Sequence, residues 1–359
     1  MSHSKEAFEE IRVALLAADE SLAEALDARA KAMQAWAELR KEEPDAYFSL
    51  PRDEEAVAAV MGAVRTFPQS ATQAVMREVI SGCQALVTPV TVAFMGHEGG
   101  FARLAARQHF GSSARLRPAA TAEAVLTEVS SGRCAYGVLP FETPYDGAVT
   151  MTLNALARSD AKISAEISLR REFFLLSQAQ TAAQVKRIYG ASVTFDACAG
   201  YLASKHADAV LIDVRNGLAA ARRAEQDSES AALTTAAVRE LSELPVLAEH
   251  VEDASDLHTR FVIVGHDYPP RTHHDRTAIA IALNDAPGVL LECLQPFAER
   301  KINVDRLETR PARGWEFRYL ILIEVAGHIT DRAVLAAIEA LRGKSPYVRV
   351  LGSYPRAEG

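Results

Sequence analysis

The first forty residues of the chain set the strongest limit on its fold. From Lys5 to Glu43 the sequence contains neither proline nor glycine, and alanine and leucine are frequent. Such a stretch favours helix at every position, because these residues lose little conformational freedom in a helix. Apolar residues from Ile11 to Trp36 also recur at nearly helical spacing. We therefore expect one long helix over the whole stretch.

This helix opens an all-helical region that extends to residue 88. Pro44 and Pro51 interrupt the pattern, and further helices are expected over residues 53–65 and 70–87. Three helices, one of them very long, bury little apolar surface as a single copy. We predict that copies of the chain pair, as a homodimer or a dimer of dimers.

The pattern changes to α/β over residues 89–267. The strand VTVAFMG is followed by a glycine-containing turn and by a helix over residues 101–110. Further strands are predicted over residues 135–140, 162–169, 172–177, 209–213 and 261–265. Residues 178–243 are rich in alanine and give weak strand signals. The region is typical of an open α/β domain.

A proline-containing polar segment, YPPRTHHD at residues 268–275, indicates a boundary. Residues 276–359 follow with strands near 277–283, 303–308, 317–325 and 348–353, and with helices beginning near Pro287 and Asp331. The order is βαββαβ, a split arrangement in which helices cover one sheet face. The chain is thus predicted to be a multidomain protein of α and α/β class.

Composition limits the compartment and the binding partners that the chain can have. A length of 359 residues suggests two or three domains, and a net charge of −8 argues against binding to nucleic acid or anionic membranes. The four cysteines lack metal-type spacing, and the first residues lack an apolar signal core. We expect a cytoplasmic protein with reduced thiols. The glycines of GHEGG do not match the dinucleotide fingerprint, so no cofactor or metal is predicted.

Arginines are the informative side chains of the helical region. Arg29 and Arg40 lie eleven positions apart and share a helix face, while Arg12 lies on the same helix and Arg52 follows the break. Paired helices could gather these guanidinium groups around a dicarboxylate. From spacing alone, solvated surface arginines are the more common case.

The pairs IR, DE and AR in the long helix, followed by PRDEE, resemble the all-helical chorismate mutase family over about residues 5–87. The resemblance implies that Arg12, Arg29 and Arg52 clamp the carboxylates of chorismate. Arg40 then replaces a lysine, and Asp53 a glutamate. Three positions depart from the family pattern: Ser49, Cys83 and Val87, where the last replaces a glutamine that contacts the ether oxygen.

The central region resembles prephenate dehydratase over about residues 90–266. The resemblance rests on HTRFVIVG, VAFMGHEGGFARLAARQHFG and YGVLPFETPYDGAV. It implies a two-lobed domain in which Thr259 assists departure of hydroxide, Arg260 holds a substrate carboxylate and Glu142 belongs to the site. Hydroxide leaves poorly unless it is protonated or strongly hydrogen-bonded.

Several expected hydroxyl and amide groups are missing from this region. The replaced positions are Gly100 and Ala102 in the glycine turn, Thr143 and Pro144 after Glu142, and RNG at residues 215–217. Unpaired polar groups of a substrate cost about 1–3 kcal/mol each. Such losses would alter or abolish the standard reaction.

The C-terminal region resembles an ACT regulatory domain of the phenylalanine-sensing type, through NDAPGVLLECLQPFAERKINVDRLETRP. The resemblance implies that phenylalanine binds between paired domains. The implied contact residues are Pro287, Gly288, Val289, Leu290, Glu308, Thr309, Arg310 and Pro311. An ACT domain that only dimerises is the alternative, because a fold alone does not establish a ligand.

Together these patterns favour a bifunctional chorismate mutase and prephenate dehydratase of phenylalanine biosynthesis. Its substrates would be chorismate and prephenate, and its effector L-phenylalanine. The alternative is a divergent relative, either a prephenate-processing enzyme that forms a non-aromatic product or a catalytically silent protein that responds to phenylalanine.

Overall fold

A computed structural model describes residues 2–42, 53–144, 147–254, 256–283, 286–311 and 319–357. The chain forms two compact units. The first comprises residues 1–90 and 107–115, and the second comprises the remainder. Among the described residues, none of the helices has the length and apolar character to cross a membrane.

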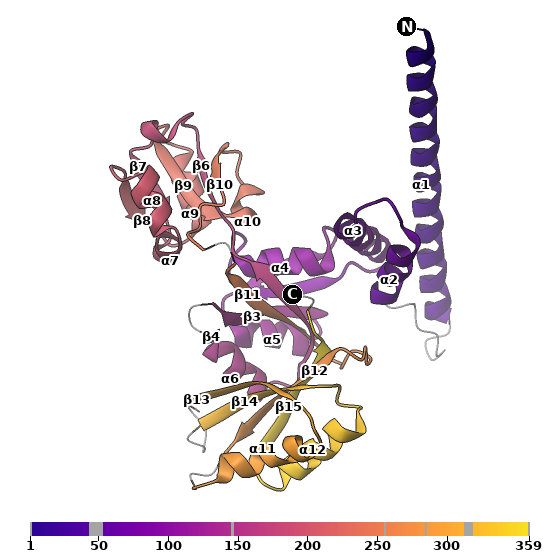
Figure 1. Ribbon diagram of the computed structural model, residues 1–359, viewed down its shortest axis with the longest axis vertical. Coiled ribbons are helices and arrows are strands. Elements are labelled where there is room, and N and C mark those ends of the chain that lie inside the picture. Colours follow the sequence, from indigo (N-terminus) through magenta and orange to yellow (C-terminus); the bar gives the residue numbers. More distant parts are fainter. Residues whose placement is uncertain are drawn as a thin grey trace. The chain divides into compact units, whose positions relative to one another are not determined.

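The first unit is helical, as predicted. Its helices are α1 (Ser2–Glu42), α2 (Asp53–Ala63) and α3 (Gln69–Val87). Helix α3 contacts both α1 and α2, and Ile80 and Cys83 are buried on it. Figure 1 shows α1 as one unbroken helix. Most of α1 is exposed, including Phe8, Ile11 and Leu15, so a single copy leaves much apolar surface in water.

A mixed sheet runs through most of the second unit. Its order is β13-β14-β12-β15-β5-β11-β3-β1-β2, and β4 pairs with β3 outside this path. The strands of what we call the first lobe are β1 (Thr91–Met95), β2 (Arg115–Ala119), β3 (Tyr136–Thr143), β4 (Gly147–Ala148), β5 (Lys162–Arg170) and β11 (His258–Gly265). Its helices are α4 (Phe101–Phe110), α5 (Ala122–Ser130) and α6 (Thr150–Arg158).

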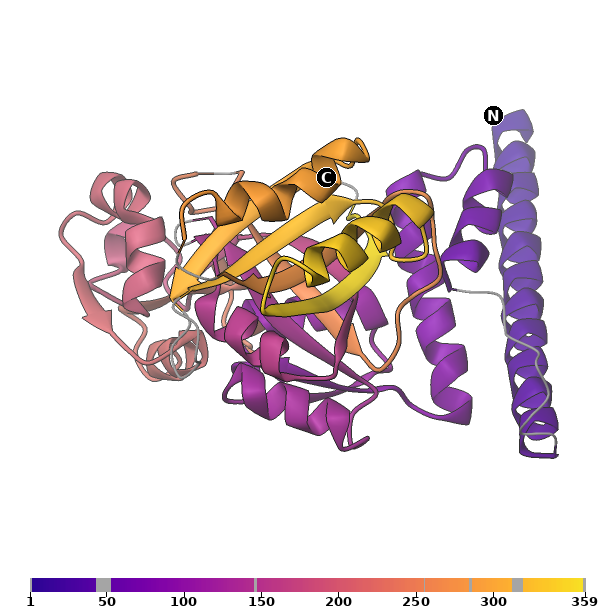
Figure 2. The same cartoon turned by 90° about the horizontal axis from the view of Figure 1, so that it is seen from below.

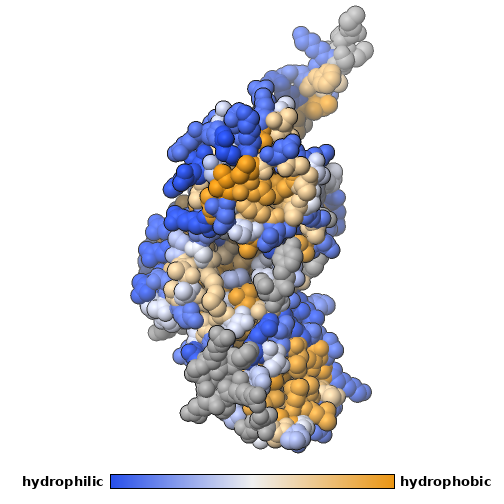
Figure 3. Space-filling view, turned by 90° about the vertical axis from the view of Figure 1, so that its left-hand side faces the viewer, coloured by the Kyte–Doolittle hydropathy of each residue, from blue (hydrophilic) through white to orange (hydrophobic). Residues whose placement is uncertain are grey.

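The chain leaves the first lobe after β5, builds a second lobe and returns in β11. The second lobe has a five-stranded sheet of order β10-β6-β9-β7-β8. The strands are β6 (Phe173–Ser177), β7 (Arg187–Gly190), β8 (Val210–Asp213), β9 (Ser230–Thr235) and β10 (Val246–Glu249). The helices are η1 (Ala182–Gln184), α7 (Ser192–Ala197), α8 (Ala199–Lys205), α9 (Gly217–Ala224) and α10 (Ala236–Arg239). Figure 3 shows apolar surface on this lobe, where Val193 and Val210 are exposed.

The C-terminal domain has the predicted βαββαβ order. Its elements are β12 (Asp275–Ala282), α11 (Val289–Glu299), β13 (Val304–Pro311), β14 (Tyr319–Ala326), α12 (Arg332–Arg342) and β15 (Tyr347–Pro355). Figures 1 and 2 show α11 and α12 side by side on one face of its sheet. Ile279 and Ile323 of that face pack with Phe297. The opposite face, including Leu322, joins the core of the first lobe through Leu156 of α6.

The C-terminal domain and the first lobe therefore share one sheet and one core. Strand β15 meets β5 in parallel, with Gly352 opposite Ile163. A side chain at position 352 would place its Cβ 2.4 Å from the Ile163 carbonyl oxygen, so the close approach requires glycine. Residues 268–275, predicted as a linker, connect β11 and β12 within one compact unit.

Five of the described strands were missed by sequence reasoning: β2, β4, β7, β9 and β10. Strand β9 is buried at every one of its positions, so the usual alternation of polar and apolar residues is absent from SAALTT. Strand β2 contains Pro118 and forms an edge of the large sheet, where proline is tolerated. The strands predicted elsewhere in the central region are confirmed.

Candidate active site

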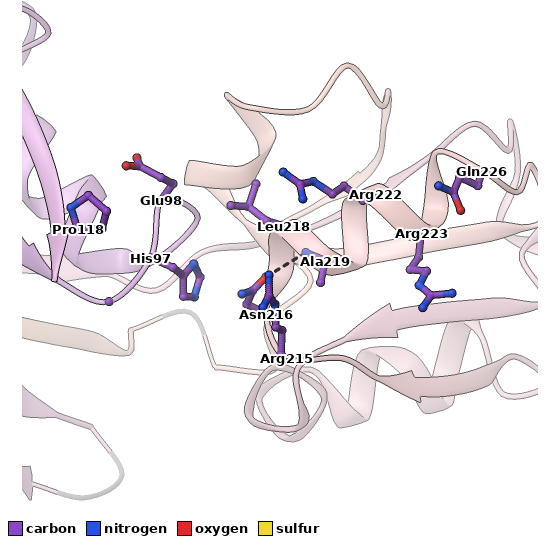
Figure 4. A pocket seen from close by; sticks show the side chains of 11 residues that line it. His97, Glu98, Pro118, Arg215, Asn216, Leu218, Ala219, Arg222, Arg223 and Gln226 are labelled. Atoms are coloured by element: carbon purple, nitrogen blue, oxygen red, sulfur yellow. Dashed lines mark hydrogen bonds between the residues drawn. The ribbon is translucent and has the colours of Figure 1, made fainter. Parts of the chain in front are cut away.

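A cavity of about 510 Å³ opens between the two lobes of the second unit. One wall is the turn after β1, with Gly96, His97 and Glu98, together with Pro118 of β2. The other wall is the start and one face of α9. Figure 4 shows the two walls, with His97 projecting toward Asn216. The volume lies in the range typical of small-molecule sites.

The fold places the cavity where α/β proteins commonly bind ligands. The turn with His97 follows the carboxyl end of β1, which pairs in parallel with β3. Helix α9 begins after β8, and Asn216 caps it by accepting a hydrogen bond from Ala219 N at 2.9 Å. Residue 217 must be glycine, because a Cβ there would lie 2.2 Å from the buried Thr234 hydroxyl oxygen.

Positive charge dominates the α9 wall. Arg215, Arg222 and Arg223 line it, and within the described parts of the chain none of them forms an ion pair. Partial removal from water, and then the charge of Arg215, lower the pKa of His97. Glu98 also lines the cavity, but its carboxylate pairs with Arg103 at 2.9 Å. The lining therefore favours an anion.

Polar contacts join the two lobes beside the cavity. The buried hydroxyl of Thr235, at the end of β9, donates to the Gly99 carbonyl oxygen at 2.9 Å. Arg103 of α4 also lies 3.5 Å from Glu240 of the second lobe. The glycine turn thus contacts the second lobe directly at the edge of the cleft.

Thr259 lies at the start of β11, opposite Leu169 of β5, and its side chain is 6% exposed. It is not part of the cavity lining. Neighbouring residues of a strand point to opposite faces of the sheet, so Thr259 and Arg260 face different surroundings. The two residues of the predicted motif are therefore separated by the strand itself.

The guanidinium group of Arg260 has all five of its N–H donors matched to acceptors. Nε donates to Glu166 at 2.7 Å, and Nη1 donates to Glu324 at 2.8 Å and to Glu142 at 3.5 Å. Nη2 donates to Glu324 and, at 3.2 Å, to the Tyr354 hydroxyl. Glu324 and Tyr354 belong to the C-terminal domain. The structure thus brings the predicted site residues Arg260 and Glu142 together, at the junction with that domain.

The residues predicted to bind phenylalanine occupy two places in the C-terminal domain. Gly288 has a left-handed φ of 82° and precedes α11, and Pro287 is exposed beside it, with Val289 and Leu290 in the first turn. In β13, Glu308 pairs with Arg310 at 3.1 Å, and Thr309 is exposed. Pro311 ends the strand, and its side chain lies outside the described residues.

The predicted arginines of the helical unit are only partly described. Arg12 is exposed and donates to Glu9 at 3.0 Å, while Arg29 is half-buried. The side chains of Arg40, Arg52 and Asp53, and residue Ser49, lie outside the described residues. Val87 is half-buried at the end of α3.

Comparison with known proteins identifies the family. A family model for prephenate dehydratase matches residues 92–269, and one for the ACT domain matches residues 277–343. The bifunctional chorismate mutase/prephenate dehydratase of Pseudomonas aeruginosa is 34% identical over 282 residues, which cover 78% of this chain and 77% of the relative. The chain belongs to the prephenate dehydratase family. A bifunctional relative from Aquifex aeolicus is 31% identical over 81% of this chain and 80% of its own length.

Solved structures of dehydratases resemble this one over three quarters of the chain. The prephenate dehydratase of Arthrobacter aurescens in complex with L-Phe is 31% identical, with a TM-score of 0.69 over 75% of this chain and 90% of its own. A structure described as a novel type of quorum quenching acylase, GqqA, is 26% identical, with a TM-score of 0.67 over 74% of this chain and 98% of its own. The dehydratase and ACT regions predicted from the sequence are confirmed as family domains.

Sequence reasoning missed Arg222 and Arg223, which line the cavity, and Glu324, which binds Arg260. The spacing of Ala219, Arg222, Arg223 and Gln226 at intervals of three and four marks one face of α9 and could have indicated the first two. Within β14, YLILIEVA, Glu324 is the only charged residue, and its presence in an apolar strand was the available signal.

Proposed function

We propose that the central domain converts prephenate to phenylpyruvate, with loss of carbon dioxide and water, in the cleft between its two lobes. The observation that supports this assignment is the cationic cavity described above, in a chain of the prephenate dehydratase family. Prephenate carries two carboxylates, and a pocket lined by several arginines suits such a dianion. Carbon dioxide and hydroxide leave as the ring becomes aromatic, and one proton converts the hydroxide to water.

Each wall of the cleft has a proposed role. Arg215 and Arg222 hold substrate carboxylates, assisted by the partial positive charge at the start of α9. Thr259, buried at the start of β11 and outside the cavity lining, is the residue that the family motif assigns to the departing hydroxide. The contact between Thr235 and Gly99 keeps water from the reacting ring. Glu142 contributes through Arg260, rather than by contact with the cavity.

The flanking regions complete the proposal. The ACT domain binds L-phenylalanine at the α11 start and β13, and thereby controls the dehydratase. The helical unit is a chorismate mutase domain, and two copies of the chain build its site around paired α1 helices. The residues proposed to contact chorismate are Arg12, Arg29 and Arg40 of α1, together with Arg52 and Asp53. The apolar side chains exposed along α1 support pairing as a dimer or higher oligomer. We place the protein in the cytoplasm.

Turnover of prephenate by the purified full chain tests the proposal, with phenylpyruvate followed by ultraviolet absorbance. Replacing Arg215 by Gln should raise KM for prephenate roughly 10- to 150-fold, because a hydrogen bond to a charged group contributes about 1.5–3 kcal/mol. Arg117→Gln is the control, since Arg117 is exposed beside Pro118 but does not line the cavity. Equal effects of the two changes would reject the cavity as the substrate site.

A second candidate is a different reaction in the same cleft. The hydroxyl groups expected at Gly100 and Ala102 are absent, and the GqqA structure shows that a protein described as an acylase has a closely similar fold. Consumption of prephenate without phenylpyruvate would indicate a non-aromatic product. Lack of any prephenate consumption, with phenylalanine still bound, would favour the silent, phenylalanine-responsive protein.

A further inference from the structure

The junction between the first lobe and the ACT domain contains a group of charged side chains that the proposed reaction does not use. We call Arg260, Glu142, Glu166, Glu324, Arg306 and Tyr354 the junction cluster. Its members come from six strands of the large sheet. Glu324 is 1% exposed and the Glu166 side chain 3% exposed, so both are withdrawn from water.

The cluster joins the strand of Thr259 to the segment predicted to bind phenylalanine. Glu142, which Arg260 contacts, also accepts a hydrogen bond from Arg306 of β13. Arg306 donates in turn to Glu308 at 3.0 Å, and Glu308 pairs with Arg310 at 3.1 Å. Positive and negative groups therefore alternate without interruption from β11 to β13.

A second branch fixes Arg260 from the other side. Glu166 accepts from Arg260 at 2.7 Å and from Arg276 at 2.9 Å, while the Tyr354 hydroxyl donates to Glu324 at 3.0 Å. The Arg260 guanidinium carbon also lies 5.0 Å from the centre of the Phe141 ring. Arg260 is thus held by four strands besides its own.

Such a cluster responds to change as a unit. A buried charge is tolerated only while its partners remain in place, so displacement of one member forces the others to rearrange or to lose their hydrogen bonds. Movement of Arg306 at β13 would alter the partners of Glu142 and, through it, of Arg260. Because Thr259 precedes Arg260 in the same strand, a shift of the Arg260 backbone moves Thr259.

We propose that Arg260 is a positioning residue, not a substrate ligand, and that the junction cluster transmits the binding of phenylalanine at β13 to Thr259. The proposal rests on the proposed function for its substrate and effector. In this proposal Thr259 faces the substrate, and Arg260, on the opposite face of β11, positions the strand. A substrate carboxylate would reach its donors only by displacing a carboxylate already bound.

The test replaces Glu324 by Gln in the full chain, which removes one charge while preserving the shape of the side chain. Phenylalanine binding is measured by the rise in melting temperature. Inhibition is measured as the ratio of the rate without L-phenylalanine to the rate with saturating L-phenylalanine. We expect the thermal shift to remain and the inhibition ratio to fall at least tenfold, within the usual range for coupling between sites. Arg349→Gln is the matched control. Arg349 pairs with Asp160 at 2.6 Å across the same junction but does not contact the cluster.

A second variant covers the case in which Glu324→Gln does not fold. Arg306→Gln breaks the link between Glu142 and Glu308 at a position with 13% side-chain exposure, and it should weaken inhibition in the same way. Inhibition of either folded cluster variant to the wild-type degree would overturn the proposal. So would an equal loss in Arg349→Gln, because that would indicate general loosening of the junction.

Failure of the proposed reaction is read separately. If the wild-type chain forms no phenylpyruvate, coupling is measured as amide hydrogen exchange in β11 with and without L-phenylalanine. Protection of β11 that appears in the wild type and in Arg349→Gln, but not in Glu324→Gln, supports the cluster independently of chemistry. A wild-type chain that shows neither a thermal shift nor a change in β11 exchange with L-phenylalanine refutes the coupling.

Discussion

Replacing Thr235 by valine should open the contact between the two lobes. The Thr235 hydroxyl donates to the Gly99 carbonyl oxygen at 2.9 Å, and its side chain is 9% exposed. Valine has nearly the same shape but no donor, so the carbonyl oxygen would remain in a poorly hydrated place without this partner. The loss amounts to about 1–3 kcal/mol, which corresponds to a roughly 5- to 150-fold change in an equilibrium constant.

The neighbouring threonine provides an internal control. Thr234 is 1% exposed, and its hydroxyl oxygen has no hydrogen-bond partner in the described parts of the chain. Its replacement by valine removes a buried polar group that is already unsatisfied, so stability should be unchanged or slightly higher. We expect Thr235→Val to lower the melting temperature and raise KM for prephenate, and Thr234→Val to do neither. Equal melting temperatures and KM values for the two variants would refute the role assigned to the Gly99 contact.

Two further predictions concern the other domains. Burial raises the pKa of Glu324, but the hydrogen bonds from Arg260 and the nearby positive charges outweigh burial and hold this pKa below its usual 4.5. The stability that such a carboxylate contributes is complete above its pKa in the unfolded chain. It disappears as the pH falls through its pKa in the folded chain. The melting temperature should therefore decline below about pH 4.5, and the decline should be shallower in Glu324→Gln, whereas an identical decline would exclude Glu324 as a contributor. In the helical unit, Val87→Gln should increase chorismate consumption by the full chain, since it supplies a donor for charge that develops at the ether oxygen; an unchanged rate in a folded variant would contradict the role given to this position.

The elements that sequence reasoning placed correctly are those whose patterns are local. Helix α1 followed from a stretch without proline or glycine, and β12 and β14 followed from apolar runs bounded by turn residues. The βαββαβ order was therefore predictable, as was the family of the central domain from HTRFVIVG and its companions. Each of these signals is contained in one continuous stretch of sequence.

The second lobe was less predictable because its strands are short and enclosed. Strand β9 is buried at all its positions, and β7 and β10 have only four residues each, too few for a period to be recognised. The cavity depended on a longer-range fact, that α9 faces the turn after β1 from the other lobe. Spacing within α9 could mark the face with Arg222 but not the surface that this face meets.

The surroundings of Arg260 determine which other cations must bind the carboxylates of the substrate. Within a motif such as TRF, the sequence gives the residues but not the surroundings on each face of the strand. Here one face of β11 carries Arg260 into a set of acceptors that occupies all five of its donors. A dianion bound in the cleft would then depend on other cations, and the α9 wall supplies them at Arg215 and Arg222. The resemblance predicts that residues 215–217 replace a hydroxyl-containing motif, which would put the loss of neutral donors and the gain of positive charge at the same wall. Charge attracts a carboxylate from a greater distance than a hydroxyl does, and the fork of a guanidinium group can orient it through two parallel hydrogen bonds. The α9 wall can therefore gather and align the substrate, while the contacts of Arg260 fix the strand that carries Thr259.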